Sequence, residues 1–263
     1  MGITLVNVKH QDVLQNLYEG LYHQLVDISD LPGINTICAK ETVETIRNRF
    51  DIISRSAIHF LGNGNFHYLT LPLLQKYKHP FSLIVFDHHN DAGKLDYEGF
   101  TSCGSWINEV VKLVPAVKKV FLVGCGEEND KEMSQEITEK IIIIPERELN
   151  PLKLYQVSKM IPTKDIYFSV DRDVLTPKEV QTNWDQGNVS TEELIDYIKI
   201  LSNDHALIGA DICGDLDWDY NMSKEYKKIP AREQAYHVNK HLFETFETIL
   251  KKTETFPSEQ QIV

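Results

Sequence analysis

The stretch FSLIVFDHHND, residues 81–91, joins an apolar run to a cluster of possible metal ligands. Its first six residues predict a buried β-strand, and the ligand-type side chains begin where that strand ends. Side chains alternate between the two faces of an extended backbone, so we expect Asp87, His89 and Asp91 to share one face. His88 falls on the other face, where we interpret it as a packed histidine or as a partner of a ligand.

A second strand end of the same kind lies further along the chain. Residues 165–170 form a β-rich run, and Asp171 and Asp173 follow it on one face. A third candidate is His67, which follows another β-rich run and the turn GNGN at 62–65. Acidic residues at a single strand end often only cap a helix. Two such ends and a histidine favour a shared site, because parallel strands place their carboxyl ends at one edge of a sheet.

The predicted site offers four carboxylates and two imidazoles, from His67, Asp87, His89, Asp91, Asp171 and Asp173. No cysteine joins this pattern, so it favours a hard or borderline divalent ion, with Mn²⁺ ahead of metals that prefer thiolate. Six ligands exceed the four that usually close a structural zinc site. They suit two ions about 3.5–4 Å apart that share carboxylates and activate water. The pattern therefore predicts hydrolysis.

Three motifs in this order resemble those of the arginase/agmatinase/formiminoglutamase (ureohydrolase) family, of which the chain looks like a divergent member. They are GNGNFH at 62–67, DHHND at 87–91 and SVDRD at 169–173, and the resemblance spans about 58–215. It implies a three-layer α/β/α sandwich with a largely parallel sheet, as in arginases and deacetylases. It also implies two Mn²⁺ ions, with Ni²⁺, Co²⁺ or Zn²⁺ as other divalent ions, and a bridging hydroxide that attacks a guanidinium or similar planar carbon.

The resemblance also implies how the ligands divide between the two ions. Asp87 and Asp171 would bridge both ions. The other four ligands would divide in pairs, His67 with Asp91 at one ion and His89 with Asp173 at the other.

Two departures from the family pattern concern the substrate rather than the metals. The family usually has Asp-Pro where this chain has Thr176-Pro177, and the segment after it is usually small and glycine-rich. Here that segment carries Trp184 and Asp185, which we expect to bind the substrate near the pocket mouth. The stretch TSCGSW at 101–106 resembles the place where arginases carry a proton-shuttle histidine, and it has none. General acid assistance is worth about 10²–10⁴-fold, so its absence disfavours arginase-like turnover of L-arginine.

A third departure lies at the last predicted strand. The family has a glutamate that pairs with the guanidinium, and this chain has Gly214 at that position and Asp215 one residue later. A shift of one residue reverses the face of a side chain on a regular strand. Asp215 is therefore a candidate catalytic residue only if a bulge or turn re-aims it toward the site. Asp185 or Asp215 would then hold the substrate cation.

Composition agrees with a soluble globular protein in which residues 1–263 form a single α/β domain, since 42% of residues are hydrophobic and 25% charged. The net charge of −12 disfavours nucleic acid as a partner and suits a cationic small-molecule substrate. No run reaches the roughly 20 apolar residues of a membrane span. The four separated cysteines favour reduced thiols and a cytoplasmic location. The family resemblance implies a possible homo-oligomer.

Apolar runs alternate with amphipathic stretches, which is typical of βαβ units. Strands are predicted near 58–61, 81–86, 118–124, 141–144, 165–170 and 205–212. Crossover helices are predicted around 70–78, 102–114, 130–139, 150–160 and 191–202. The N-terminal part predicts a short β-strand and then helices around 11–28 and 41–50, and residues 229–252 predict a closing helix. His237 and His241 on that helix are interpreted as surface or packing residues.

These observations lead to one hypothesis and two alternatives. The leading hypothesis is a dinuclear Mn²⁺ hydrolase that cleaves a C–N bond of a guanidino or linear amidine-type small molecule. The first alternative keeps the fold but uses a single metal, as deacetylase-like amidohydrolases do. The second is a non-catalytic protein that binds metal or a metabolite, which the missing histidine and the displaced carboxylate favour.

Overall fold

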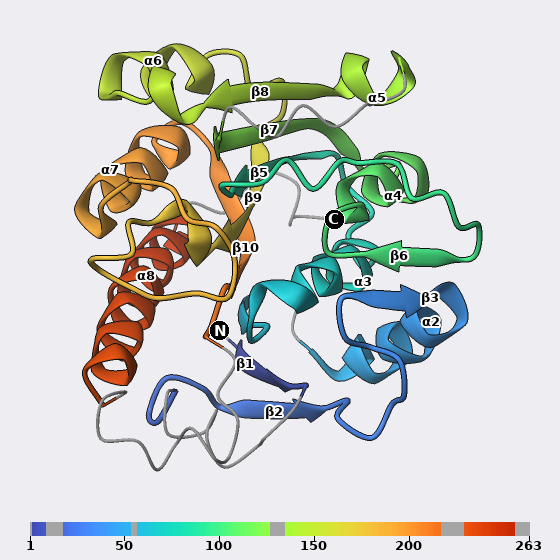
Figure 1. Cartoon of the computed structure of the whole chain (residues 1–263). Coiled ribbons are helices and arrows are strands. Elements are labelled where there is room, and N and C mark those ends of the chain that lie inside the picture. Colours follow the sequence, from blue (N-terminus) through green and yellow to red (C-terminus); the bar gives the residue numbers. More distant parts are fainter. Residues whose placement is uncertain (1, 9–17, 54–56, 127–134, 217–228, 256–263) are drawn as a thin grey trace.

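The computed structural model describes residues 2–8, 18–53, 57–126, 135–216 and 229–255. Eight strands form one sheet in which every pairing is parallel, and Figure 1 shows the helices arranged around it. The order across the sheet is β2-β1-β4-β10-β9-β5-β7-β8. The strands are β1 Gly2–Asn7, β2 Gln24–Asp27, β4 Ala57–Phe60, β5 Phe81–Phe86, β7 Val117–Cys125, β8 Ile141–Pro145, β9 Asp165–Asp171 and β10 Ala206–Cys213. All six strands predicted from apolar runs are present.

Two hydrophobic cores lie on opposite faces of this sheet, because its central strands are apolar on both sides. One core joins the sheet to α6 (Pro151–Ser158), α7 (Thr191–Ser202) and α8 (Ile229–Thr255). The other joins it to α2 (Lys40–Arg49), α3 (Thr70–Leu74), α4 (Trp106–Leu113) and α5 (Gln135–Lys140). The predicted three-layer α/β/α sandwich is confirmed.

Helix α7 begins where the sequence predicted it, for a local reason. The Ser190 side chain accepts a hydrogen bond from the Glu193 backbone N–H, and the Glu193 carboxylate accepts one from the Ser190 backbone N–H. This capping box satisfies two of the amide groups that a helix start leaves without partners. Helix α6 starts in a similar way, with Asn150 as its cap and Pro151 in its first turn.

Two predictions of local structure were wrong in part. Residues 24–27, expected at the end of a helix over 11–28, form the edge strand β2, which pairs with β1. Tertiary pairing here outweighs the helical spacing of the sequence. The helix expected from residue 102 begins at Trp106, because residues 100–102 form β6 and pair with β3 (Ile37–Ala39). Residues 11–17 and 130–134 of the predicted helices lie outside the described residues.

Within the part of the chain that the structure describes, no helix combines the length and the apolar character that crossing a membrane requires.

Candidate metal centre

The predicted ligands meet at the carboxyl edge of four adjacent strands, β4, β10, β9 and β5. His67 lies beyond β4 on the short 3-10 helix η2 (Gly64–Leu69), whose first turn is capped by Asn63. Asp87 directly follows β5, and Asp171 is the last residue of β9. The register places β5 beside β9, so motifs far apart in the sequence become neighbours.

The segment after β5 is a turn rather than an extended strand. The strand ends at Phe86, and Asp91 adopts a left-handed backbone with φ +42°, which aspartate tolerates better than most residues. This turn, and not strand alternation, brings Asp91 back toward Asp87. His88 points elsewhere, as expected, with its Nδ1 3.6 Å from Glu146 Oε2 and its backbone N–H donating to Asp173 Oδ1.

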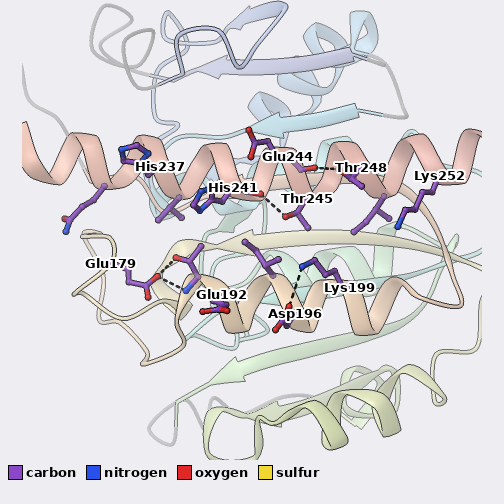
Figure 2. A pocket seen from close by; sticks show the side chains of 15 residues that line it. Glu179, Glu192, Asp196, Lys199, His237, His241, Glu244, Thr245, Thr248 and Lys252 are labelled. Carbon is purple, nitrogen blue, oxygen red and sulfur yellow. Dashed lines mark hydrogen bonds and ion pairs between the residues drawn. The ribbon is translucent and has the colours of Figure 1, made fainter.

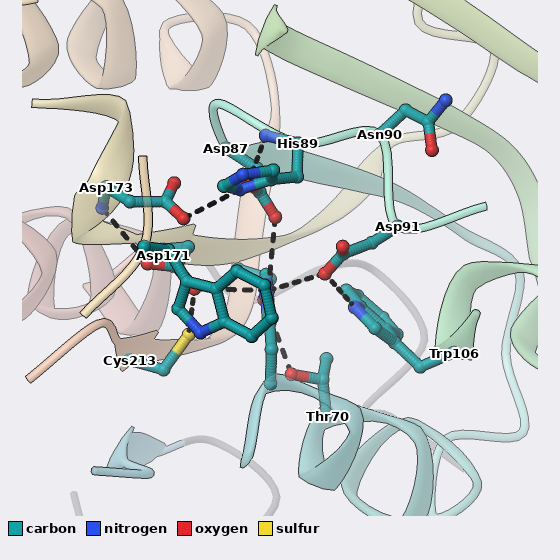
Figure 3. Close-up of polar contacts among 12 residues, drawn as sticks. Thr70, Asp87, His89, Asn90, Asp91, Trp106, Asp171, Asp173 and Cys213 are labelled. Carbon is teal, nitrogen blue, oxygen red and sulfur yellow. Dashed lines mark hydrogen bonds and ion pairs between the residues drawn. The ribbon is translucent and has the colours of Figure 1, made fainter. Parts of the chain in front are cut away.

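One group of ligand atoms surrounds His67 Nδ1. This nitrogen lies 3.1 Å from Asp91 Oδ2, 3.2 Å from Asp87 Oδ2 and 3.6 Å from Asp171 Oδ2. All four side chains are buried, and Figure 3 labels the three carboxylates among them. Such spacings between donor atoms suit ligands that share one ion at bond lengths of about 2.0–2.2 Å.

A second group surrounds His89. Its Nδ1 lies 2.9 Å from Asp173 Oδ2 and 3.5 Å from Asp87 Oδ1. Asp87 therefore offers one oxygen to each group, and the groups lie side by side (Figure 3). All six predicted ligands meet here, and their division between two ions stays a prediction.

Burial and crowded negative charge shift the pKa values of the cluster. Burial and the charge of Asp87 raise the pKa of Asp91 to about 6, and the pKa values of Asp171 and Asp173 are also raised, first by burial and then by neighbouring carboxylates. Burial lowers the pKa of His89, but Asp173 and Asp87 outweigh it and raise that pKa to about 11. A bound cation or a proton would relieve this clustered negative charge.

Two buried atoms show that the set fits a metal. His67 Nδ1 and Asp87 Oδ2 make no hydrogen bond among the described residues, although both are shielded from solvent. Unpartnered buried polar atoms are costly, and a bound divalent ion would satisfy both. The donors are carboxylates and imidazoles, which suit hard or borderline divalent ions.

Further residues, which were not predicted from the sequence, hold the predicted ligands in place. His67 Nε2 lies 2.8 Å from Ser169 Oγ, which in turn donates to Asp211 Oδ1 at 2.6 Å. Trp106 Nε1 donates to Asp91 Oδ2 at 2.9 Å. Such contacts orient metal ligands. Ser169 lies two residues before Asp171 on the same strand face, which is a signal that the sequence did contain.

A small cavity of about 70 Å³ opens onto the ligands. Its lining comprises Gly64, Asp87, His89, Asp91, Cys103, Gly104, Asp171, Asp173 and Trp184. Trp184 meets the ring of His89 edge-on, with centroids 5.7 Å apart, and donates from Nε1 to Asn65 Oδ1 at 3.0 Å. A side chain at Gly64 would press on Asp171 and Trp184, since a Cβ there would lie 2.9 Å from both. The predicted place of Trp184 at the pocket therefore agrees with the structure.

A larger hollow of about 920 Å³ lies between α7 and α8 (Figure 2). His237 and His241 line it and are exposed, as the sequence predicted for surface residues. Neither belongs to any group of described residues with metal-ligand spacing. The smaller cavity is therefore the candidate site, because it holds the reactive groups.

A sequence model of the arginase family matches residues 6–214 of this chain. The chain belongs to the arginase family. An uncharacterised protein from Thermotoga maritima is 34% identical over 209 residues, which cover 80% of this chain and 76% of that relative.

Solved structures of arginase-family proteins share the fold. A hypothetical agmatinase from Burkholderia thailandensis matches with a TM-score of 0.66 and 20% identity, over 94% of this chain and 85% of that one. The formimidoylglutamase of Bacillus subtilis gives a TM-score of 0.67 and 15% identity, over 94% and 87%. Trypanosoma cruzi formiminoglutamase with Mn²⁺ gives 0.67 and 12%, over 94% of each chain.

Asp215, the candidate catalytic residue, does not line the cavity. Gly214 turns the backbone with φ +91°, but this turn directs Asp215 to Arg172 and Tyr18 rather than to the pocket. Its two carboxylate oxygens accept from the Arg172 guanidinium and the Tyr18 hydroxyl. A Cβ at residue 214 would lie 2.7 Å from the Arg172 backbone nitrogen, so a glutamate does not fit there.

Asp185 is exposed and does not line the cavity. The structure therefore brings together the six ligands and Trp184, and it leaves Asp185 and Asp215 outside the cavity. Their roles toward substrate stay predictions.

Proposed function

We propose that this chain is a dinuclear, Mn²⁺-dependent hydrolase that cleaves a C–N bond of a small guanidino or linear amidine-type compound. Membership of the arginase family supports the reaction class. The position of Asp87 carries the proposal of two ions. Its Oδ2 lies 3.2 Å from His67 Nδ1 and its Oδ1 lies 3.5 Å from His89 Nδ1, as expected of a carboxylate that bridges two sites.

Two divalent ions bound here would supply Lewis acidity and an acidified water molecule close to neutral pH. The protein's own contribution is to hold the ligands and shape the cavity. Ser169 and Trp106 fix the orientations of His67 and Asp91 through hydrogen bonds. They thereby reduce the reorganisation that ion binding would otherwise require.

The cavity limits the group that reacts. Its volume of about 70 Å³ holds on the order of five water-sized groups, which suits a planar carbon centre with its nitrogens. Trp184 presents an aromatic ring at this cavity and is 39% exposed, so the ring can contact a cationic substrate and shield it from water. The rest of the substrate would extend past Trp184 toward solvent.

The test begins with the number of ions per chain. Elemental mass spectrometry after purification with added Mn²⁺ is expected to give two ions in the wild type, and one or none in Asp87→Asn. The exposed Asp196→Asn is the matched control and keeps two. Guanidino, ureido and formimino compounds are then screened for release of ammonia or urea. A single ion, unaffected by Asp87→Asn, would contradict the proposal.

A non-catalytic metal-binding protein is the second candidate. Asp185 and Asp215 were the two carboxylates expected to hold a substrate cation. Both lie outside the cavity, which favours this candidate. This candidate predicts two ions per chain with no turnover of any compound in the screen. A single-metal deacetylase-like enzyme is disfavoured, because the His89 group would have no role at a one-metal site.

A further inference from the structure

We infer that Cys213 is a metal ligand on the His67 side of the centre, and that it makes this position select a thiolate-accepting divalent ion such as Zn²⁺, Co²⁺ or Fe²⁺ over Mn²⁺. The inference rests on the proposed metal centre and changes its expected composition. The ion position on the His89 side would keep only carboxylate and imidazole donors, which suit Mn²⁺. The other would add a sulfur donor.

The backbone places the Cys213 side chain at the metal edge of the sheet. Cys213 is the last residue of β10 and pairs in register with Asp171, the last residue of β9. Gly214 then turns the chain away with φ +91°. The thiol therefore ends its strand beside a carboxylate that the proposed centre uses.

The distances agree with a shared ion. Cys213 Sγ lies 3.2 Å from Asp171 Oδ2, and the ligand atoms of His67, Asp171 and Cys213 all lie within 4.8 Å of one another. An ion bound at about 2.3 Å from sulfur and 2.0–2.1 Å from nitrogen requires donor atoms spaced in this way. All three side chains are buried, so solvent does not compete for the position.

A second observation points to the same position independently of the thiol. His67 Nδ1 is fully buried and has no hydrogen bond among the described residues, while its Nε2 is held by Ser169. The nitrogen lies 3.1, 3.2 and 3.6 Å from carboxylate oxygens of Asp91, Asp87 and Asp171, and Cys213 Sγ lies 3.2 Å from the last of these oxygens. An ion there would satisfy the nitrogen and accept the thiolate together.

The other three cysteines are placed differently. Cys38 donates to the Ala39 carbonyl in β3, and Cys125 to the backbone carbonyl of His89. Cys103 lines the cavity. Among the described residues, only Cys213 shares a group of metal-ligand spacing with a histidine and a carboxylate.

The consequence for the ion follows from donor softness. Thiolate donors favour zinc and the later divalent metals, whereas Mn²⁺ is the weakest binder of the first-row series. Ion binding would displace the thiol proton to solvent, which leaves the sulfur negatively charged. Four carboxylates balance two divalent ions, so the thiolate gives the loaded centre one net negative charge, which favours a cationic substrate.

Cobalt provides the first test. Wild-type protein loaded with Co²⁺ is expected to show a near-ultraviolet thiolate-to-cobalt charge-transfer band, and Cys213→Ser to lose it. Cys103→Ser and Cys38→Ser serve as matched controls, and both are expected to keep the band. A band that persists in Cys213→Ser, or that disappears in Cys103→Ser, would overturn the inference.

Competition between ions provides the second test. Protein equilibrated with equal concentrations of Zn²⁺ and Mn²⁺ is analysed by elemental mass spectrometry. The wild type is expected to hold one Zn²⁺ per chain firmly, and Cys213→Ser to lose this preference by more than about tenfold. An unchanged preference in the variant would contradict the role of the thiol.

One measurement needs no variant and separates the two proposals. X-ray absorption of zinc-loaded wild type is expected to show a sulfur scatterer at about 2.3 Å. Two bound ions without any sulfur scatterer would refute the ligand role of Cys213 alone. A folded wild type that binds no ion would refute the proposed metal centre and with it this inference.

Discussion

Arg172 and Asp215 form an ion pair from which solvent is almost wholly excluded, with side chains 0% and 2% exposed. Arg172 stands between the ligands Asp171 and Asp173, but its side chain reaches the other way, toward Asn239 on α8, to which it donates at 2.9 Å. The strand that carries the predicted ligands is therefore anchored to the closing helix through Arg172.

This pair predicts that Asp215→Asn acts mainly on stability. A buried guanidinium left without its carboxylate costs about 3–5 kcal/mol, so the free energy of unfolding should fall by that order in chemical denaturation. Asp204→Asn, which removes an exposed partner of Lys159, is the control and should change little. Lost activity with unchanged stability would instead support a catalytic Asp215.

Because His59 is buried, we expect the protein to lose stability in acid. Burial, aided by Lys76, lowers its pKa to about 3, while an unfolded histidine titrates near its ordinary value of 6.5. Between these values the unfolded state binds the extra proton, so this residue's contribution to stability falls by about 1.4 kcal/mol for each pH unit of acidification.

The measurement is the free energy of unfolding from pH 7 to pH 4 for wild type and His59→Gln. The variant should have the shallower pH dependence, and the exposed His23→Gln should follow the wild type. Parallel curves for wild type and His59→Gln would show that His59 takes a proton in the folded protein.

Ion binding predicts a rise in melting temperature. An ion at a concentration 100-fold above its dissociation constant stabilises the folded state by about 2.7 kcal/mol, provided that it does not bind the unfolded chain. Calorimetry with and without Mn²⁺ should show this rise in the wild type and a much smaller one in Asp87→Asn. An equal rise in both would mean that the ion binds elsewhere.

We expect substitution of Trp184 to weaken substrate binding and to leave the number of bound ions unchanged. Removing an aromatic face from a cation costs about 0.5–2 kcal/mol, so Trp184→Ala should raise KM by roughly 2–30-fold on any cationic substrate that the screen finds. Trp184→Phe keeps a ring but loses the hydrogen bond to Asn65, and should lie between. Both variants should hold the same number of ions as wild type, and a loss of ions would assign Trp184 to the centre's framework instead.

The sequence predicted those features that local pattern determines. Apolar runs located six strands, and ordered acidic strand ends indicated six side chains that the fold brings together. It did not predict β2, because a four-residue edge strand depends on its pairing with β1.

The residues that contact Asp215 and Cys213 could not be predicted from the local sequence pattern either. Asp215 accepts a hydrogen bond from Arg172, 43 residues earlier, and Cys213 lies beside Asp171, 42 residues earlier. Both relationships follow from the pairing of β9 with β10. No spacing within either strand indicates that pairing.

The position of β10 in the sheet has a consequence for biosynthesis. It is the last strand among the described residues, yet it lies between β4 and β9 and separates the β2-β1-β4 strands from the β9-β5-β7-β8 strands. Until residue 213 has left the ribosome, the nascent chain holds two half-sheets with open edges, which are prone to pair wrongly. His67 belongs to the first half and the ligand carboxylates to the second. The group around His67, which draws on both halves, can therefore form only after β10 has been translated.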